Sequence, residues 1–305
     1  MTSFLLHADD FGLSSGTNQS IIESIEKGHV SSVSLLANGD AVREAVEYLK
    51  TNSDVRVSIH LNLQEGVPAA KPDDIPLLVT KGGHLDASFQ RLFWFSTTKS
   101  KTLRKELSQQ IGIEFNQQIE KSFALLGSRL DMLRLDSHSH IHAIPIVFDT
   151  ILSLDTATPI EYIRILKEPT YFARNTTEWA RPFGLNAIKH SILNYFSEYM
   201  IDKLTAHNIG HNDFLIGILH SGKMTKAALI EGLAACRKVI EPSRAGLSSI
   251  VEVLIHPGQA TPNENKLWAD RADLWKFYSS SDRRAELELS KDVELKAILS
   301  NENMA

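Results

Sequence analysis

Residues 3–12 read SFLLHADDFG, an apolar run that ends abruptly in two adjacent carboxylates, Asp9 and Asp10. Short apolar runs without alternation are typical of strands that are covered on both faces of a sheet. Residues 250–258, IVEVLIHPG, repeat this pattern, because an apolar run is followed at once by His256. Strands of this kind occur in parallel sheets flanked by helices, so the two stretches favour an α/β fold.

The same pattern recurs along the whole chain. Apolar segments predict strands at 3–8, 31–37, 55–61, 131–136, 160–166, 213–219 and 250–256. Amphipathic segments between them predict helices at 16–28, 40–51, 101–126, 188–207 and 225–240, and the charged tail from Trp268 is also helical in pattern. Strands that alternate with helices predict parallel strands in a barrel or in a doubly wound sheet.

Residues 66–100 do not fit this alternation. They contain three prolines, a Gly-Gly pair and an aromatic cluster, namely Pro68, Pro72, Pro76, Gly82, Gly83, Phe89, Phe93, Trp94 and Phe95. Long loops in compact domains are often functional, so this excursion is a candidate lid or substrate wall. An aromatic patch on the outside of the barrel or at a subunit contact is an equal alternative. Exposed aromatic side chains near Trp94 and Trp268 would then support a homodimer.

Composition limits the classes of partner. Apolar residues make up 43% of the chain and charged residues 23%, as in ordinary globular proteins, while the net charge of −5 gives no reason to expect nucleic acid or a membrane as partner. Cys236 is the only cysteine, which excludes an internal disulfide and fits a reducing compartment. The start, MTSFLLHADD, turns acidic before a signal peptide could form, and no apolar run reaches the roughly 20 residues that span a bilayer. We therefore expect a cytoplasmic protein.

Polar side chains stand at or just after the carboxyl ends of the predicted strands. They are Asp9, Asp10, His60, Asp136, His138, Arg164, His220 and His256. Barrels and open parallel sheets both build their active sites at this edge. Asp9 and Asp10 are also candidate helix caps, but Ser14 lies closer to the next helix and serves better.

One aspartate and two histidines from three strand ends would make a facial metal site with open positions. Taken alone, a histidine such as His60 on an apolar strand is more often a satisfied core residue than a ligand. Imidazole and carboxylate together suit Zn²⁺, and also Ni²⁺, Co²⁺ or Mn²⁺. His138, His140 and His142 follow one another at every second position, so they would share one face if the strand continued. One ion will not bind all three, and the spacing alone does not select the ligand.

Five motifs occur in order: HADDFGLSSGTNQSI (7–21), VSIHLNLQEGVP (57–68), LDSHSHIHAIP (135–145), IRILKEP (163–169) and VLIHPG (253–258). In this order they resemble the YdjC-like carbohydrate deacetylases, a family that includes chitooligosaccharide deacetylases. The resemblance covers most of the chain. It implies a single domain over residues 1–305, a TIM-like (β/α) barrel of about seven parallel strands.

The resemblance also implies roles for residues. One divalent metal, Mg²⁺ or Zn²⁺, would be held by Asp10, His60 and His138. Asp9 would be the general base for the attacking water, His256 the acid for the leaving amine, and Arg164 would steady the charge of Asp9. His140 and His142 would contact the sugar or support a ligand, and Asp136 is a candidate to orient an imidazole.

The implied substrate is an N-acetylated sugar or oligosaccharide, whose amide bond is hydrolysed. Two other functions remain open at this stage. A metal-dependent phosphoesterase on the same barrel would gather more ligands for two or three metals, and His140 and His142 are available for that. A sugar-binding protein without activity would need neither Asp9 nor His256.

Overall fold

The computed structural model describes residues 2–130, 132–172, 185–243 and 249–300. In these residues, seven strands form a single sheet: β1 (Thr2–Phe11), β2 (Ser32–Leu35), β3 (Arg56–Leu61), β4 (Leu133–Ser137), β5 (Ile160–Ile163), β6 (Phe214–Ile216) and β7 (Ser249–Ile255). Their order is β5-β4-β3-β2-β1-β7-β6, and every pairing is parallel. All seven predicted strands are confirmed, as is the α/β class.

The sheet curls into a half-barrel, and its edge strands β5 and β6 are not joined by a continuous ladder in the described residues. Near the seam, the Leu215 N–H donates to the Lys167 carbonyl over 2.8 Å. The side chain of Asn212 bonds both backbone groups of Ile165, at 2.7 and 2.9 Å. The predicted TIM-like barrel is thus confirmed, with loops and one side chain in place of an eighth strand at the seam.

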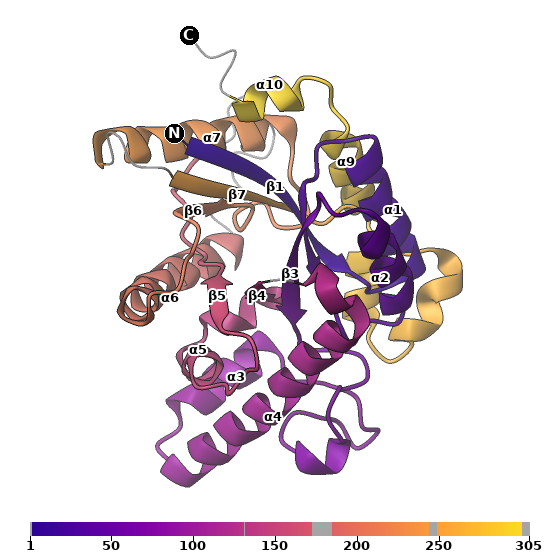
Figure 1. Cartoon of the computed structure of the whole chain (residues 1–305), viewed down its shortest axis with the longest axis vertical. Coiled ribbons are helices and arrows are strands. Elements are labelled where there is room, and N and C mark those ends of the chain that lie inside the picture. Colours follow the sequence, from indigo (N-terminus) through magenta and orange to yellow (C-terminus); the bar gives the residue numbers. More distant parts are fainter. Residues whose placement is uncertain (1, 131, 173–184, 244–248, 301–305) are drawn as a thin grey trace.

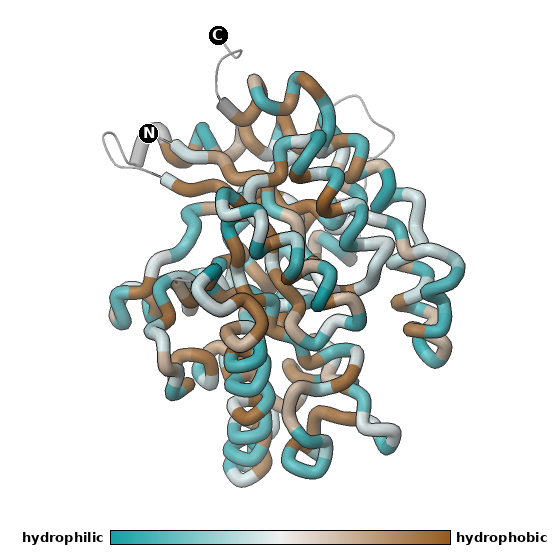
Figure 2. Tube along the Cα trace, turned by 45° about the vertical axis from the view of Figure 1, so that its right-hand side comes forward, coloured by the Kyte–Doolittle hydropathy of each residue, from teal (hydrophilic) through white to brown (hydrophobic). Residues whose placement is uncertain are grey.

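Helices surround the sheet, and many of the hydrophobic residues lie toward the centre of the molecule (Figures 1 and 2), where they form the buried core. The five predicted helices are confirmed as α1 (Ser15–Glu26), α2 (Val42–Thr51), α4 (Lys101–Leu126), α6 (Leu185–His207) and α7 (Lys226–Ser243), and α5 (Pro145–Leu152) follows β4. Ser14 caps α1, since its side chain accepts from the Thr17 N–H. Asp9 and Asp10 are therefore not used as caps. No helix of the described residues is long and apolar enough to cross a membrane.

The excursion at 66–100 contains a 3₁₀ turn at Pro72–Asp74 and the helix α3 (Phe89–Thr97). On α3, Trp94 is 65% exposed. The expectation of an exposed Trp268 is wrong, because this residue is only 4% exposed. Its indole N–H donates to Glu65 over 2.7 Å and its ring lies 4.7 Å from that of Tyr278.

The C-terminal segment, residues 262–290, returns to the carboxyl edge of the sheet. It comprises the 3₁₀ turn Pro262–Trp268, α8 (Ala272–Tyr278) and α9 (Ser281–Ser290), and α10 (Leu295–Ser300) follows it. In Figure 1, α9 lies beside α1. Arg283 and Glu286 on α9 have no exposed surface, although the sequence there looks like an ordinary charged tail. This segment therefore brings buried charges to the edge where the polar strand ends meet.

Candidate metal centre and active site

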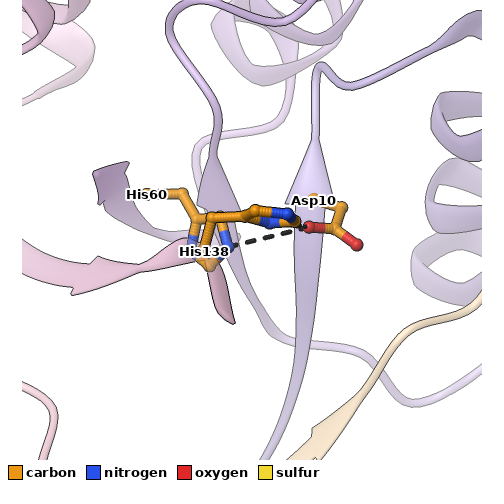
Figure 3. Close-up of side chains that lie close together, drawn as sticks. All are labelled: Asp10, His60 and His138. Carbon is orange, nitrogen blue, oxygen red and sulfur yellow. Dashed lines mark hydrogen bonds and ion pairs between the residues drawn. The ribbon is translucent and has the colours of Figure 1, made fainter. Parts of the chain in front are cut away.

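Asp10, His60 and His138 come together at the carboxyl edge of the barrel (Figure 3). Oδ1 of Asp10 lies 3.0 Å from Nδ1 of His138 and 3.7 Å from Nε2 of His60. All three side chains are buried. The Asp10 backbone has a φ of 69°, and the β1–β2 register shifts between Ala8 and Phe11. At this local break both neighbouring carboxylates reach the same cavity, where Nε2 of His60 lies 3.9 Å from Asp9 and 3.7 Å from Asp10.

Both imidazoles are fixed by a carboxylate on the nitrogen that does not face Asp10. Nδ1 of His60 lies 2.7 Å from Oδ1 of Asp136, and Nε2 of His138 lies 3.0 Å from Oε1 of Glu65. Histidines that bind metals are commonly held in this way, because the carboxylate sets the tautomer and orientation of the ring. The predicted orienting role of Asp136 therefore agrees with its position. One carboxylate and two oriented imidazoles fit a divalent cation.

The charges around the site also fit a cation. Burial alone would raise the pKa of the Asp10 carboxyl, but His138 and Arg283 hold it well below its usual range. Burial alone would lower the pKa of His138, but Asp10 and Glu65 raise it to about 10. Without a bound metal, a proton on His138 therefore supplies positive charge here. A cation that binds to Nδ1 must displace that proton.

Three residues of the C-terminal segment support the candidate ligands, and no motif or spacing in the sequence distinguishes these three. The Arg283 guanidinium donates to Oδ2 of Asp10 over 3.2 and 3.3 Å, which leaves Oδ1 for the imidazoles. The Tyr278 hydroxyl donates to Glu65 and lies 3.2 Å from Nε2 of His138. Trp268 donates to the other oxygen of Glu65. Glu65 itself stands five residues after His60 in a quoted motif, but no spacing rule distinguishes it from a loop residue.

Glu65→Gln should lower the affinity for a divalent cation by about 10- to 100-fold, because the replacement keeps the size of the side chain but removes the charge that orients His138. The measurement is isothermal titration of metal-free protein with Zn²⁺. Glu47→Gln is the matched control, since Glu47 on α2 is 78% exposed. Equal affinity in both variants would show that Glu65 does not support the site.

Arg164 is buried and forms ion pairs with three carboxylates. Its NH1 donates to Asp9 over 2.9 Å, its NH2 lies 2.9 Å from Asp136, and its Nε donates to Glu252 over 2.7 Å. Burial alone would raise the pKa of Asp9, but Arg164 and His60 hold it well below its usual range. Asp9 is therefore ionised at neutral pH, and the predicted pairing of Arg164 with Asp9 is present.

A second cluster with metal-like spacing consists of His7, Asp9 and Asp136. The Arg164 guanidinium bonds both carboxylates of this cluster. An arginine keeps its charge at any ordinary pH, so it already compensates the two carboxylates. In this cluster the Arg164 guanidinium therefore supplies the positive charge that a metal ion would otherwise supply.

His256 stands at the end of β7, and its Nε2 lies 4.0 Å from Oδ2 of Asp9. Its backbone N–H donates to Glu286 of α9 over 2.5 Å. Burial lowers the pKa of His256 to about 4, against the opposite effect of Asp10 and Asp9. The imidazole is therefore neutral at neutral pH when no other ligand is present.

The three histidines after Asp136 do not share one face, contrary to the expectation for a continued strand. β4 ends at Ser137, and a 3₁₀ turn follows in which Ser139 and His140 have φ values of 54° and 61°. These left-handed residues break the alternation. Nδ1 of His142 lies 2.5 Å from the Ser137 hydroxyl and its Nε2 lies 2.9 Å from the Arg164 carbonyl.

A cavity of about 200 Å³ opens above the Asp10–His60–His138 cluster. Its lining residues are Asp9, Asp10, His60, Gln64, His138, Ser139, His140, Lys189, Ser221, His256, Leu274, Phe277 and Tyr278. The predicted candidates His140 and His256 thus lie on the cavity, whereas His142 does not. Arg164 lies behind Asp9, and His220 is buried with its ring 5.6 Å from that of Tyr171. Gln64, Lys189, Ser221 and Phe277 were not predicted.

The curled parallel sheet and the carboxylate–imidazole cluster at its carboxyl edge define a (β/α)-barrel protein with a candidate metal centre. A sequence model of the YdjC-like proteins matches residues 3–301. The chain therefore belongs to the YdjC-like family, as its motifs suggested.

Relatives of known name agree with this family. A carbohydrate deacetylase of Clostridium beijerinckii is 32% identical over a region that covers 62% of this chain and 72% of that protein. A carbohydrate deacetylase of Danio rerio is 23% identical and covers 93% of this chain and 90% of that protein. A solved structure from Enterococcus faecalis, described as a proposed cellobiose-phosphate cleavage protein, has a TM-score of 0.65 at 17% identity and covers 98% of this chain and 94% of that one. The last likeness shows the fold alone.

Proposed function

We propose that this protein is a metal-dependent carbohydrate deacetylase that hydrolyses the acetamide of an N-acetylated sugar, of the chitooligosaccharide type. The observation that carries the proposal is the convergence of Asp10, His60 and His138 on one point beside Asp9 and His256. The curated relatives named as carbohydrate deacetylases support the reaction class.

The metal site would be formed by Oδ1 of Asp10, Nε2 of His60 and Nδ1 of His138. A divalent cation bound there supplies an acidified water and a polarised carbonyl. Two imidazole nitrogens favour Zn²⁺, Ni²⁺, Co²⁺ or Mn²⁺ over Mg²⁺, since Mg²⁺ prefers oxygen ligands. One equivalent of metal per chain is expected.

Proton transfer would be carried by Asp9 and His256. The ionised carboxylate of Asp9 accepts the proton of the attacking water, and Arg164 holds that carboxylate in place. His256 is neutral at rest, so it needs a proton before it can protonate the leaving nitrogen. Nε2 of His256 and Oδ2 of Asp9 are 4.0 Å apart, beyond a direct hydrogen bond, so the proton taken by Asp9 would pass through one bridging water to the imidazole and on to the amine. His140 would contact the sugar from the cavity wall, and His142 would support Arg164 from behind.

The second cluster argues against a phosphoesterase with two metals. Phosphoesterases of that kind use paired ions to hold both the attacking and the leaving oxygen. Here the neighbouring group of His7, Asp9 and Asp136 is compensated by Arg164. One metal position beside a fixed guanidinium suits amide hydrolysis better.

The test is acetate release from diacetylchitobiose and N-acetylglucosamine, measured with each of the five metals and after removal of metal by a chelator. We expect turnover of at least one sugar, its loss after chelation, and recovery with one equivalent of metal. If the protein binds two equivalents of metal at saturation and cleaves a phosphoester, the proposed function is wrong and the protein is a phosphoesterase. No acetate from any N-acetyl sugar would refute the proposed substrate class.

A further inference from the structure

One part of the cavity wall carries three polar side chains that take no part in the metal site or the proton transfers proposed above. They are the ammonium of Lys189, the imidazole of His140 and the hydroxyl of Ser221. Within residues 2–130, 132–172, 185–243 and 249–300, none of the three has a side-chain hydrogen bond or ion pair, and Nδ1 of His140 is buried without a partner. Buried polar atoms normally find partners, so the unpartnered Nδ1 of His140, beside the half-buried ammonium of Lys189 and hydroxyl of Ser221 on the same cavity, indicates a ligand.

The topology of the barrel explains why these side chains gather on one side. His140 follows β4, Lys189 lies in the second turn of α6 after β5, and Ser221 follows β6. β5 lies next to β4 in the sheet, and β6 meets β5 across the seam. The three residues therefore occupy the arc of the barrel from β4 to the seam. The metal ligands Asp10 and His60 come from β1 and β3.

Charge makes this arc suited to an anion. Burial lowers the pKa of Lys189 to about 8, so its ammonium is the main form at neutral pH. The imidazole of His140 carries at least one N–H that can donate a hydrogen bond, whichever its protonation state. Glu168 is the carboxylate that acts on Lys189, but its oxygens accept from the backbone N–H groups of Gly217 and Leu219, and no ion pair joins it to Lys189 among the described contacts.

We propose that Lys189, His140 and Ser221 form a subsite that binds a carboxylate or phosphate group. An ammonium, an imidazole N–H and a hydroxyl can together donate three hydrogen bonds to the oxygens of such a group. Two sources share this chemistry: the acetate that deacetylation releases, and an acidic substituent on the sugar. The choice between these sources rests on the proposed function, whereas anion binding itself does not.

Binding is tested first with simple anions. Sodium phosphate and sodium acetate are titrated into wild-type protein, Lys189→Met and Lys189→Arg at constant ionic strength, with and without metal. We expect Lys189→Met to weaken binding at least about tenfold and Lys189→Arg to retain most of it. Lys203→Met is the matched control on the same helix, because Lys203 lies away from the cavity and pairs with Asp149 over 2.6 Å. Absence of saturable binding to wild type, or equal affinity in wild type and Lys189→Met, would overturn the subsite.

Kinetics then identify the source of the anion. N-Acetylglucosamine and its 6-phosphate are compared as substrates in wild type and Lys189→Met. If the subsite binds an acidic substituent on the sugar, KM in Lys189→Met should rise at least about tenfold for the phosphorylated sugar alone. If the subsite instead binds the acetate product, the inhibition constant of acetate should rise in Lys189→Met, and both sugars should be affected alike. If neither sugar reacts but phosphate binding depends on Lys189, the subsite stands and the proposed deacetylation falls. If a sugar reacts and no anion binding depends on Lys189, the subsite alone falls.

Discussion

His138→Ala should abolish tight binding of a divalent cation and lower the rate of acetate release by at least about 100-fold. The reason is geometric: Nδ1 of His138 lies 3.0 Å from Oδ1 of Asp10, and its other nitrogen is held by Glu65. Removal of the ring leaves Asp10 and His60 with too few ligands for a stable site. The measurements are metal content after dialysis and turnover of diacetylchitobiose with one equivalent of metal.

The neighbouring histidines provide the control for this prediction. His140→Ala removes a ring on the cavity wall, and His142→Ala removes one that lies behind Ser137 and Arg164. Both variants should bind metal as the wild type does, because neither ring is a member of the cluster with Asp10. If all three variants lose metal equally, the assignment of His138 as the ligand is wrong.

Asp9→Asn should lower kcat by about 10²- to 10⁴-fold while metal binding stays within a few-fold of wild type, because the amide cannot accept a proton. Asp9 bonds Arg164 and faces the cavity, but it is not a member of the cluster of Asp10, His60 and His138. The two effects are separated by titration with metal and by single-turnover kinetics on the same preparation.

Asp149→Asn is the matched control for this substitution. Asp149 lies on α5, is 46% exposed and pairs with Lys203. Its replacement should leave both kcat and metal affinity unchanged. Full activity in Asp9→Asn would remove the proposed base and would favour a sugar-binding protein without catalysis.

The strands, and the edge at which the candidate ligands meet, could be predicted from local sequence, whereas the choice of His138 among its neighbouring histidines came from the resemblance to the YdjC-like family. Apolar runs mark strands, and parallel strands bring their carboxyl ends to one edge, so Asp10, His60 and His138 converge without knowledge of the loops. Register adds a detail of the same kind. His60 lies directly opposite Asp136 on the neighbouring strand, and this is the carboxylate that orients it.

The remaining groups could not be predicted, because their positions depend on contacts between distant parts of the chain. Arg283 reaches Asp10 across 273 positions, and Tyr278 reaches His138 across 140. The exposure expected for Trp268 failed for the same reason, since Glu65 and Tyr278 cover it. The alternation expected for His138, His140 and His142 failed where two left-handed residues ended the strand.

The return of the C-terminal segment has a consequence for the order in which the protein matures. Synthesis on the ribosome proceeds from the N-terminus, so the candidate ligands Asp10, His60 and His138 leave the ribosome well before Tyr278 and Arg283. A nascent chain then has Asp10 without its guanidinium and Glu65 without its hydroxyl and indole partners. The contacts that Trp268, Tyr278 and Arg283 make with Glu65 and Asp10 can form only after residue 283 has been made. We therefore expect the proposed metal site to reach its native affinity only after that point.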